Sequence, residues 1–277
     1  MGSLISELMG QPDEQMDHML GIDERRKGEC SRHGNFIDIH YSGKGRVSEG
    51  WKGCPECADE AIQARMREEE RQRQLEMMRE RAVRFVAKSG IPKRFADKGF
   101  DEYRPVSGKS ASVLRKIQEY GDLLASGKHE GRSLILLGNV GNGKTHLSCA
   151  LLRDVILRTC KPGEYWTFAE LIREVKGSWR KSSDYSEQDV YDQFAKPELV
   201  ILDEVGMQNF TEFEQTVAYE AINARYLLEK PTVLITNLPA SDLNKCLGER
   251  VVDRLRENGG KALGFDWLSY RQGGDAA

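Results

Sequence analysis

The sequence lacks long apolar runs and has almost no excess of charge of either sign. Its 277 residues carry 41 Lys and Arg against 44 Asp and Glu, a formal net charge of -3. Such a balance gives no strong overall attraction for nucleic acid, so any DNA contact must come from a local patch. No apolar run can span a bilayer, and the first residues lack the basic and apolar segments of a signal peptide. We therefore expect a cytoplasmic protein.

Cysteine is also scarce, and the six present are too few for a disulfide scaffold in a chain of this size. Three of them lie near a histidine in two short pairs, Cys30-Ser-Arg-His33 and Cys54-Pro-Glu-Cys57. Two-residue gaps let both members of a pair turn toward one ion, and four N and S ligands favour tetrahedral Zn²⁺. We expect a structural zinc site at these four residues, with no open position for catalysis. His40 is an alternative ligand to His33, but the tighter spacing favours His33.

The segment around these pairs is too small to bury a core without metal. Residues 35–41 and 46–51 read as two strands joined through a glycine turn at 43–45. Residues 1–27 hold two short apolar patches, which indicate either a small partner-binding helix or a loosely ordered terminus. We therefore expect a small zinc-ribbon-like module near the N-terminus.

Glycine and proline are absent from residue 58 to residue 88, where helix-forming residues dominate. Glu69 and Arg73 lie four apart in the direction that supports a helix. Residues 67–74 contain no apolar side chain, which excludes a continuous heptad seam. The pattern predicts a charged, solvated helical spacer rather than a coiled coil.

The most specific motif is Gly138-Asn-Val-Gly-Asn-Gly-Lys-Thr145, which fits the phosphate-binding P-loop G-x-x-x-x-G-K-[ST]. An apolar strand at 132–137 precedes it and a helical pattern at 146–153 follows, so an accidental glycine turn is a poor alternative. The glycines let backbone N–H groups face phosphate oxygens. Lys144 is expected to reach the β- and γ-phosphates, and the Thr145 hydroxyl to bind Mg²⁺. The cofactor-binding residues expected here are Gly138, Asn139, Val140, Gly141, Asn142, Gly143, Lys144, Thr145 and His146.

Two further apolar strands end in polar residues. Residues 198–204 end in Asp203 and Glu204, which matches the Walker B pattern: Asp203 is expected to hold Mg²⁺ and Glu204 to act as general base. Residues 231–237 end in Asn237, which we expect to hold the attacking water or the γ-phosphate. The carboxyl ends of parallel strands meet at one edge of a sheet, so these side chains should converge.

Arginines mark the helical pattern at 248–256. An arginine that reaches the γ-phosphate of a neighbouring subunit would complete the chemistry, and Arg250 is the first candidate and Arg254 the second. The alternative is a salt bridge within the chain to Glu249 or Asp253. Residues 179–186 interleave aromatic and basic side chains, a mixture equally compatible with single-stranded nucleic acid and with an ordinary exposed loop.

Taken together, these motifs and the segments 91–95, 248–250 and 265–271 resemble the DnaC-type helicase loaders and their IstB-like relatives, which are AAA+ ATPases. The resemblance covers roughly residues 90–272. It implies an α/β P-loop fold with sheet order 5-1-4-3-2, an arginine finger acting in trans at Arg250, and a sensor-2-like contact at Arg271. It also implies an N-terminal segment that binds a DnaB-type replicative helicase. The zinc module departs from the short DnaC form and looks similar to phage and prophage relatives.

The resemblance favours an ATP-dependent helicase loader that binds single-stranded DNA and assembles into an AAA+ oligomer, a hexamer with the helicase. An IstB-type transposition helper and an ATP-binding adaptor with little turnover are the alternatives. Hydrolysis by isolated subunits is expected to be weak if Arg250 works only in trans. The predicted segments are an N-terminal segment 1–27, a zinc module 28–60, a charged helix 61–89, an ATPase domain 90–272 and a tail 273–277.

Overall fold

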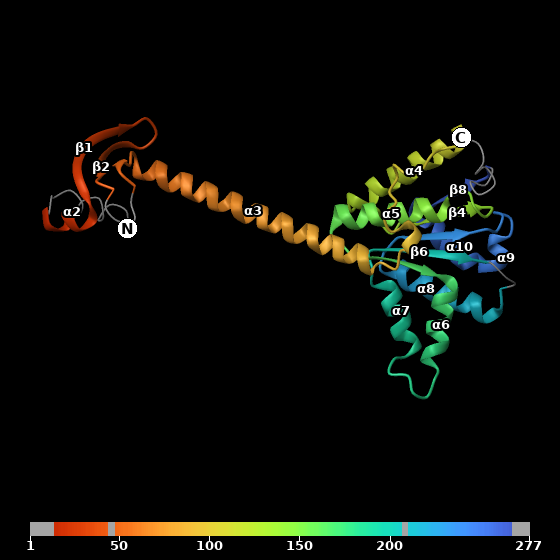
Figure 1. Cartoon of the computed structure of the whole chain (residues 1–277). Helices are drawn as coiled ribbons and strands as arrows, with labels where there is room; N and C mark the ends of the chain where they lie inside the picture. Colours follow the sequence, from red (N-terminus) through yellow and green to blue (C-terminus); the bar gives the residue numbers. More distant parts are fainter. Residues whose placement is uncertain (1–13, 44–47, 207–209, 268–277) are drawn as a thin grey trace. The chain divides into compact units, whose positions relative to one another are not determined.

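The computed structural model describes residues 14–43, 48–206 and 210–267. The chain divides into two compact units, Met1–Glu76 and Met77–Ala277, and the division falls inside one long helix, α3 (Pro55–Lys88) (Figure 1). Each unit is described by itself. In the described part of the chain, no helix is both long enough and apolar enough to cross a membrane.

The N-terminal unit contains a small antiparallel sheet. Helix α2 (Glu14–Leu20) is followed by β1 (Ile22–Cys30), β2 (Gly34–Tyr41) and β3 (Gly50–Trp51), which lie in the order β1-β2-β3. The predicted strand 35–41 corresponds to β2, whereas only Gly50 and Trp51 of the predicted strand 46–51 form β3. Residues 44–47 lie outside the described part of the chain. Strand β1 was not predicted, because its sequence is charged along most of its length and only Ile22 is buried. A strand that is polar on both faces carries no alternating signal.

Helix α3 is the predicted charged helix, and it begins earlier than expected, at Pro55. Proline suits the first helical position because its missing N–H would be unpaired there in any case. Within α3 only Ala82 is buried, which agrees with a solvated spacer. The helix therefore starts inside the segment predicted as the zinc module. The predicted domain boundaries stay a prediction.

The C-terminal unit is built on a five-stranded parallel sheet in the order β5-β6-β7-β4-β8. The strands are β4 (Leu134–Gly138), β5 (Gly163–Thr167), β6 (Leu199–Val205), β7 (Thr232–Thr236) and β8 (Lys261–Phe265). Counted from the P-loop strand β4, and read from the β8 edge, this order is 5-1-4-3-2. The predicted α/β fold with AAA+ strand order is therefore confirmed.

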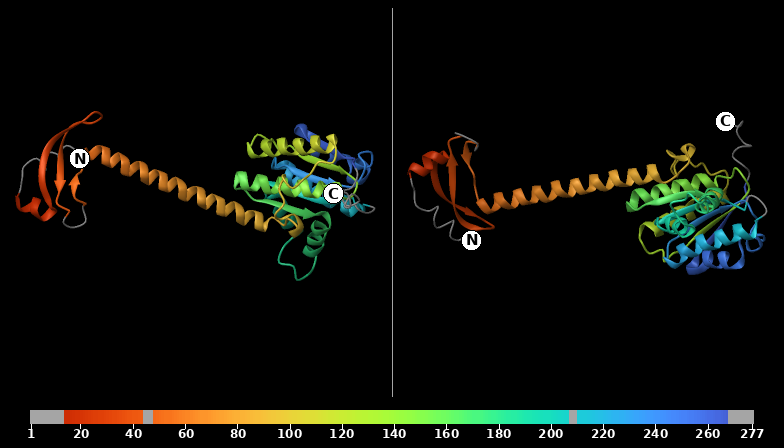
Figure 2. Two further views of the ribbon diagram at one scale, coloured as in Figure 1. Left: turned by 45° about the horizontal axis from the view of Figure 1, so that its top comes forward. Right: turned by 90° about the horizontal axis from the view of Figure 1, so that it is seen from below.

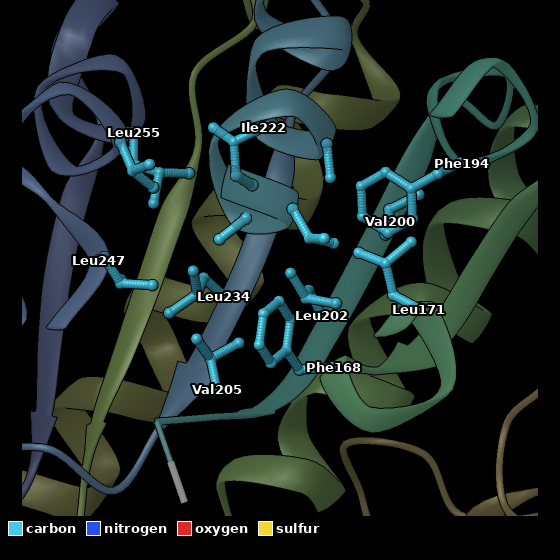
Figure 3. Close-up of a cluster of buried hydrophobic side chains, with 14 of the residues drawn as sticks. Phe168, Leu171, Phe194, Val200, Leu202, Val205, Ile222, Leu234, Leu247 and Leu255 are labelled. Atoms are coloured by element: carbon cyan, nitrogen blue, oxygen red, sulfur yellow. The ribbon is translucent and has the colours of Figure 1, made fainter. Parts of the chain in front are cut away.

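Helices cover both faces of this sheet, and Figures 1 and 2 show the three layers. Buried side chains of α4 (Gly108–Ala125) and α5 (Lys144–Thr159) pack with Leu134 and Leu136 on one face. Ile135 and Leu137 face the opposite layer (part of which is shown in Figure 3), since successive strand residues alternate between faces. That layer contains α6 (Phe168–Ser178), α7 (Glu187–Ala195), α8 (Glu212–Leu227), α9 (Leu243–Leu247) and α10 (Glu249–Arg256). The described residues of this unit also form two short 3-10 helices, η1 (Lys93–Phe95) and η2 (Glu257–Gly259).

Candidate functional site

The P-loop connects β4 to α5 with three glycines in the left-handed region: φ is 140° at Gly138, 88° at Gly141 and 89° at Gly143. A Cβ atom at Gly138 would lie 2.3 Å from the carbonyl oxygen of Phe265, and one at Gly143 would lie 2.7 Å from the Tyr103 ring. Larger residues would therefore clash as well as strain the backbone. The loop has the tight course that phosphate binding requires.

Lys144 is buried at the start of α5, and its ammonium lies within the loop. The Nζ atom donates to the carbonyl oxygens of Gly138 at 2.6 Å and Asn139 at 2.7 Å. Burial lowers the pKa of Lys144 to about 8, although the nearby charge of Asp203 favours the protonated form. An ammonium held here lies where it can bind the phosphates of a nucleotide.

The two predicted magnesium ligands lie side by side. Asp203, buried at the end of β6, accepts a hydrogen bond from Thr145 Oγ1 at 2.8 Å. The same Oδ2 atom accepts from the hydroxyl of Tyr165 at 2.8 Å, while Oδ1 accepts from the backbone N–H of Glu204 at 2.7 Å. Hydroxyl and carboxylate oxygens are the hard ligands that Mg²⁺ prefers, so this donor set fits the ion.

Tyr165, in strand β5, was not among the site residues expected from the sequence. Strand β5 lies beside β6, with Tyr165 opposite Ile201 and Thr167 opposite Asp203. Burial raises the pKa of Tyr165, and the charge of Asp203 raises it further. The hydroxyl therefore stays protonated and donates. A tyrosine in a strand neighbouring the Walker B strand was the available signal.

Glu204 has an unusual backbone conformation at the end of β6. Its φ is 62°, and the β6–β7 register shifts between Leu202 and Val205. Strain of this kind is often found at functional sites. The Glu204 side chain is exposed and lines a pocket that Asn237, after β7, also lines. Glu204, the predicted general base, and Asn237 therefore line one cavity with Lys144 and Thr145.

This pocket has a volume of about 840 Å³. One wall comes from residues 89–104, here termed the strap, which follows α3. From the strap, Phe95 and Tyr103 lie against His146, with ring centroids 6.0 Å and 5.8 Å away. His146 Nε2 lies 3.2 Å from the Gly99 carbonyl oxygen, and burial lowers the pKa of its ring. The lining residues are Gly90, Pro92, Arg94, Phe95, Lys98, Glu102, Tyr103, Arg104, Val140, Gly141, Gly143, Lys144, Thr145, His146, Tyr165, Thr167, Glu170, Asp203, Glu204 and Asn237.

Asn142 in the P-loop connects the loop to the backbone at the end of β8. Its side chain is buried, and Nδ2 donates to the carbonyl oxygens of Phe265 and Trp267, each at 2.7 Å. Trp267 Nε1 donates back to the Asn142 carbonyl at 3.2 Å. Asn142 does not line the pocket. The structure thus fastens the loop to the end of β8 through this residue.

The arginines of α10 differ in their surroundings. Arg254 lies over the rings of Tyr219 and Tyr226, 4.5 Å and 5.4 Å from their centroids. Arg250 is exposed and, among the residues that the structure describes, forms no ion pair. Arg250 is therefore the one of the two candidates whose guanidinium is available to another molecule. Arg271 lies outside the described residues.

A second group of candidate ligand side chains lies in the N-terminal unit. Ligand atoms of Cys30, His33, Cys54 and Cys57 all lie within 4.8 Å of one another. His33 Nδ1 is 3.3 Å from Cys57 Sγ, 3.5 Å from Cys54 Sγ and 3.7 Å from Cys30 Sγ. Backbone N–H groups of Arg32 and His33 lower the pKa of the Cys30 thiol to about 6. The donor set of three thiols and one imidazole fits Zn²⁺.

Residues around this cluster hold its ligands in place. His33 Nε2 lies 3.1 Å from Glu60 Oε1, which orients Nδ1 toward the three thiols. Buried Asp38 accepts from the backbone N–H of Gly53 at 2.7 Å, next to Cys54. His40 instead lies against the Trp51 ring and 3.7 Å from Asp23. The structure therefore assembles the cluster around His33.

The aromatic and basic loop at 179–186 joins α6 to α7, which project from the sheet as a pair (Figure 1). The Trp179 side chain is 57% exposed, and its ring centroid is 5.1 Å from that of Phe213. Its Nε1 donates to Glu187 at 2.9 Å, and Arg180 and Lys181 are exposed nearby in sequence. An exposed, fixed ring beside cations can stack on an unpaired base.

Comparisons with known proteins find relatives that match most of the chain. The model of the IstB-like ATP binding protein family matches residues 62–256. The chain is 29% identical over 186 residues to the replicative helicase loader DnaC of Escherichia coli K12, covering 66% of this chain and 73% of that protein. It is 26% identical over 226 residues to the uncharacterized protein YdaV of the same strain, covering 82% of each.

Solved structures share the fold. A crystal structure of the DnaC helicase loader superposes with a TM-score of 0.56 at 23% identity, covering 62% of this chain and 99% of that one. The replication initiator DnaA bound to AMPPCP and single-stranded DNA gives a TM-score of 0.52 at 20% identity, covering 64% of this chain and 51% of that one. These likenesses support the AAA+ architecture of the C-terminal unit.

Proposed function

Because this chain belongs to the IstB-like ATP-binding family, we propose that it is an ATP-dependent loader of a DnaB-type replicative helicase. The observation that carries the proposal is its similarity over 68% of its length to relatives described as replicative helicase loaders, such as DnaC of Buchnera aphidicola. The loader would act in the cytoplasm at the initiation of DNA replication. The bound nucleotide would control whether the loader binds or releases the helicase. It can do so only if ATP has different affinities for the helicase-bound and the released state.

In this proposal the described pocket binds and hydrolyses ATP. Lys144 and the loop amides bind the phosphates, and Thr145 and Asp203 hold Mg²⁺, which neutralises charge on the phosphates when bound. Glu204 accepts the proton of the attacking water, and Asn237 orients that water. The support for these roles is that all five side chains line one pocket.

Hydrolysis also needs a cation at the transferring phosphoryl group, and we assign that role to Arg250 of a neighbouring subunit. The exposed, unpaired guanidinium described above suits a contact in trans. Subunits would then hydrolyse ATP weakly alone and faster within an oligomer. Single-stranded DNA would bind at the 179–186 loop through Trp179, and a structural Zn²⁺ would hold the N-terminal module together for partner binding.

The deciding experiment is capture of partners by the full chain with ATP and Mg²⁺. A DnaB-type helicase recovered with the protein, and lost with Lys144→Ala, is the expected result. Recovery of a transposase instead would replace the loader with a transposition helper. Helicase binding without any measurable hydrolysis, even with single-stranded DNA present, would favour a nucleotide-binding adaptor.

A further inference from the structure

The end of helix α3 is fastened to strand β5 at one residue, Tyr165. The backbone N–H of Tyr165 donates to the Ser89 carbonyl oxygen at 2.7 Å. The next residue, Gly90, has φ of 75°, and a Cβ atom there would lie 2.7 Å from the Tyr165 carbonyl oxygen. Phe85 and Val86 of α3 pack on the same core cluster as Tyr165. The end of α3 and the start of the strap therefore lie directly on the Tyr165 backbone.

The Tyr165 side chain also reaches the carboxylate of Asp203, the proposed Mg²⁺ ligand. Its hydroxyl donates to Asp203 Oδ2 at 2.8 Å, the atom that also accepts from Thr145. With the Glu204 N–H on Oδ1, donors hold both oxygens of Asp203 and fix the plane of the carboxylate. Partners of this kind set how well a metal ligand presents itself to the ion.

We propose that Tyr165 is a positioning residue that orients Asp203 for Mg²⁺ and couples this orientation to the docking of the α3 end on β5. The proposal rests on the proposed function in one respect, that Mg²⁺ and ATP bind in this pocket. A change at Asp203 is transmitted through one rigid ring to the backbone that holds Ser89. Nucleotide binding would thereby alter how the C-terminal end of α3 docks on β5. Helix α3 is continuous from Pro55 to Lys88, so the same helix leads to the N-terminal module.

The first test removes only the hydroxyl, with Tyr165→Phe in the full chain. We measure the Mg²⁺ concentration that half-saturates tight binding of a fluorescent ATP analogue. Loss of the hydroxyl that holds Asp203 is expected to raise this Mg²⁺ concentration on the order of tenfold. The affinity for the analogue without Mg²⁺ should stay the same. Tyr120→Phe is the matched control, because it removes a buried hydroxyl that donates to the Arg132 carbonyl at 2.7 Å, away from the pocket. An unchanged Mg²⁺ requirement in Tyr165→Phe overturns the positioning role.

The second test measures, by hydrogen exchange, whether nucleotide binding affects the backbone bond between Tyr165 and Ser89. The amide proton of Tyr165 reports directly on the bond to Ser89 through its hydrogen-exchange rate. In the native chain, Mg²⁺ with a non-hydrolysable ATP analogue should slow this exchange. In Tyr165→Phe at saturating analogue, the slowing should be lost. Equal slowing in both proteins, or none in the native chain, overturns the coupling.

A perturbation from the other side completes the test. Gly90→Ala forces the strap away from the Tyr165 carbonyl, so it should raise the Mg²⁺ requirement in the same direction as Tyr165→Phe. No change overturns the coupling. Failure of the proposed function looks different: the native chain would then bind no nucleotide with or without Mg²⁺.

Discussion

Thr145 Oγ1 donates a 2.8 Å hydrogen bond to Asp203 Oδ2, although the two residues are 58 positions apart in the chain. The contact joins the start of α5 to the end of β6, so both predicted magnesium ligands are preorganised before any ion arrives. Glu204 follows directly in sequence and is exposed, whereas Asp203 is buried. In the proposed mechanism metal binding and water activation belong to separate groups, so separate substitutions can test them.

Glu204→Gln should abolish hydrolysis while ATP still binds. Removing a general base costs about 10²- to 10⁴-fold in kcat, and the amide keeps the size of the side chain. Nucleotide affinity, measured by calorimetry, should change little because the Glu204 carboxylate is not among the groups that hold Asp203. Asp203→Asn is the contrasting variant, and its first effect should be a higher Mg²⁺ requirement. Full turnover by Glu204→Gln would remove the base assignment.

Arg250→Ala should lower hydrolysis by the assembled protein by about 10³-fold or more, the effect of losing an arginine finger. Nucleotide affinity of single subunits should stay the same, because the residue would serve its neighbour. Arg256→Ala, on the same helix and also exposed, is the matched control. Mixing Arg250→Ala with Lys144→Ala subunits should restore part of the activity at mixed interfaces. Equal losses in Arg250→Ala and Arg256→Ala would contradict a finger role.

Nucleotide affinity should fall as pH rises above about 8. The pKa of Lys144 lies at about 8 because the side chain is buried, and bound phosphates favour the charged ammonium and raise that pKa. Affinity is therefore full below pH 8, and binding at pH 8 to 9 takes up a proton. Calorimetry in buffers of different ionisation enthalpy measures this uptake. Lys144→Arg keeps its charge and should show no such uptake, however weakly it binds.

Glu60→Ala should weaken zinc binding on the order of tenfold, because the carboxylate that orients His33 is lost. Glu60→Gln keeps an acceptor for His33 Nε2 and should recover most of the affinity. Glu76→Ala, an exposed position on the same helix, serves as the control. Competition with a chelator gives the affinities, and metal analysis of Cys54→Ser should show loss of zinc. Purified native protein without zinc would contradict the site itself.

The sequence predicted the parts of the site that depend on short-range patterns. A P-loop and a Walker B strand need residues of fixed type at fixed spacing, so Lys144, Thr145 and Asp203 could be found without a fold. The metal cluster could be found for the same reason, since only two residues separate Cys54 from Cys57. The parallel order of the sheet followed from the family resemblance and is confirmed by the strand pairing.

The missed features depend on contacts between distant segments. Tyr165 acquires its partner only because β5 lies beside β6, so it could be found only by combining the expected strand order with the sequence of β5. Strand β1 is held by pairing with β2 rather than by an apolar face, so its charged sequence resembled a terminus. Helix α7, which was not predicted, is a short segment capped by Ser186 within a polar stretch.

The bond from Asn142 to the backbone of Phe265 and Trp267 means that the ATP site depends on the last strand of the sheet. A shortened chain that stops before Phe265 would keep every motif residue from Gly138 to Asn237 and still lose the clamp on its phosphate loop. A fused reporter at this edge, or a deletion of β8, is therefore expected to leave all of these motif residues in place and still weaken ATP binding.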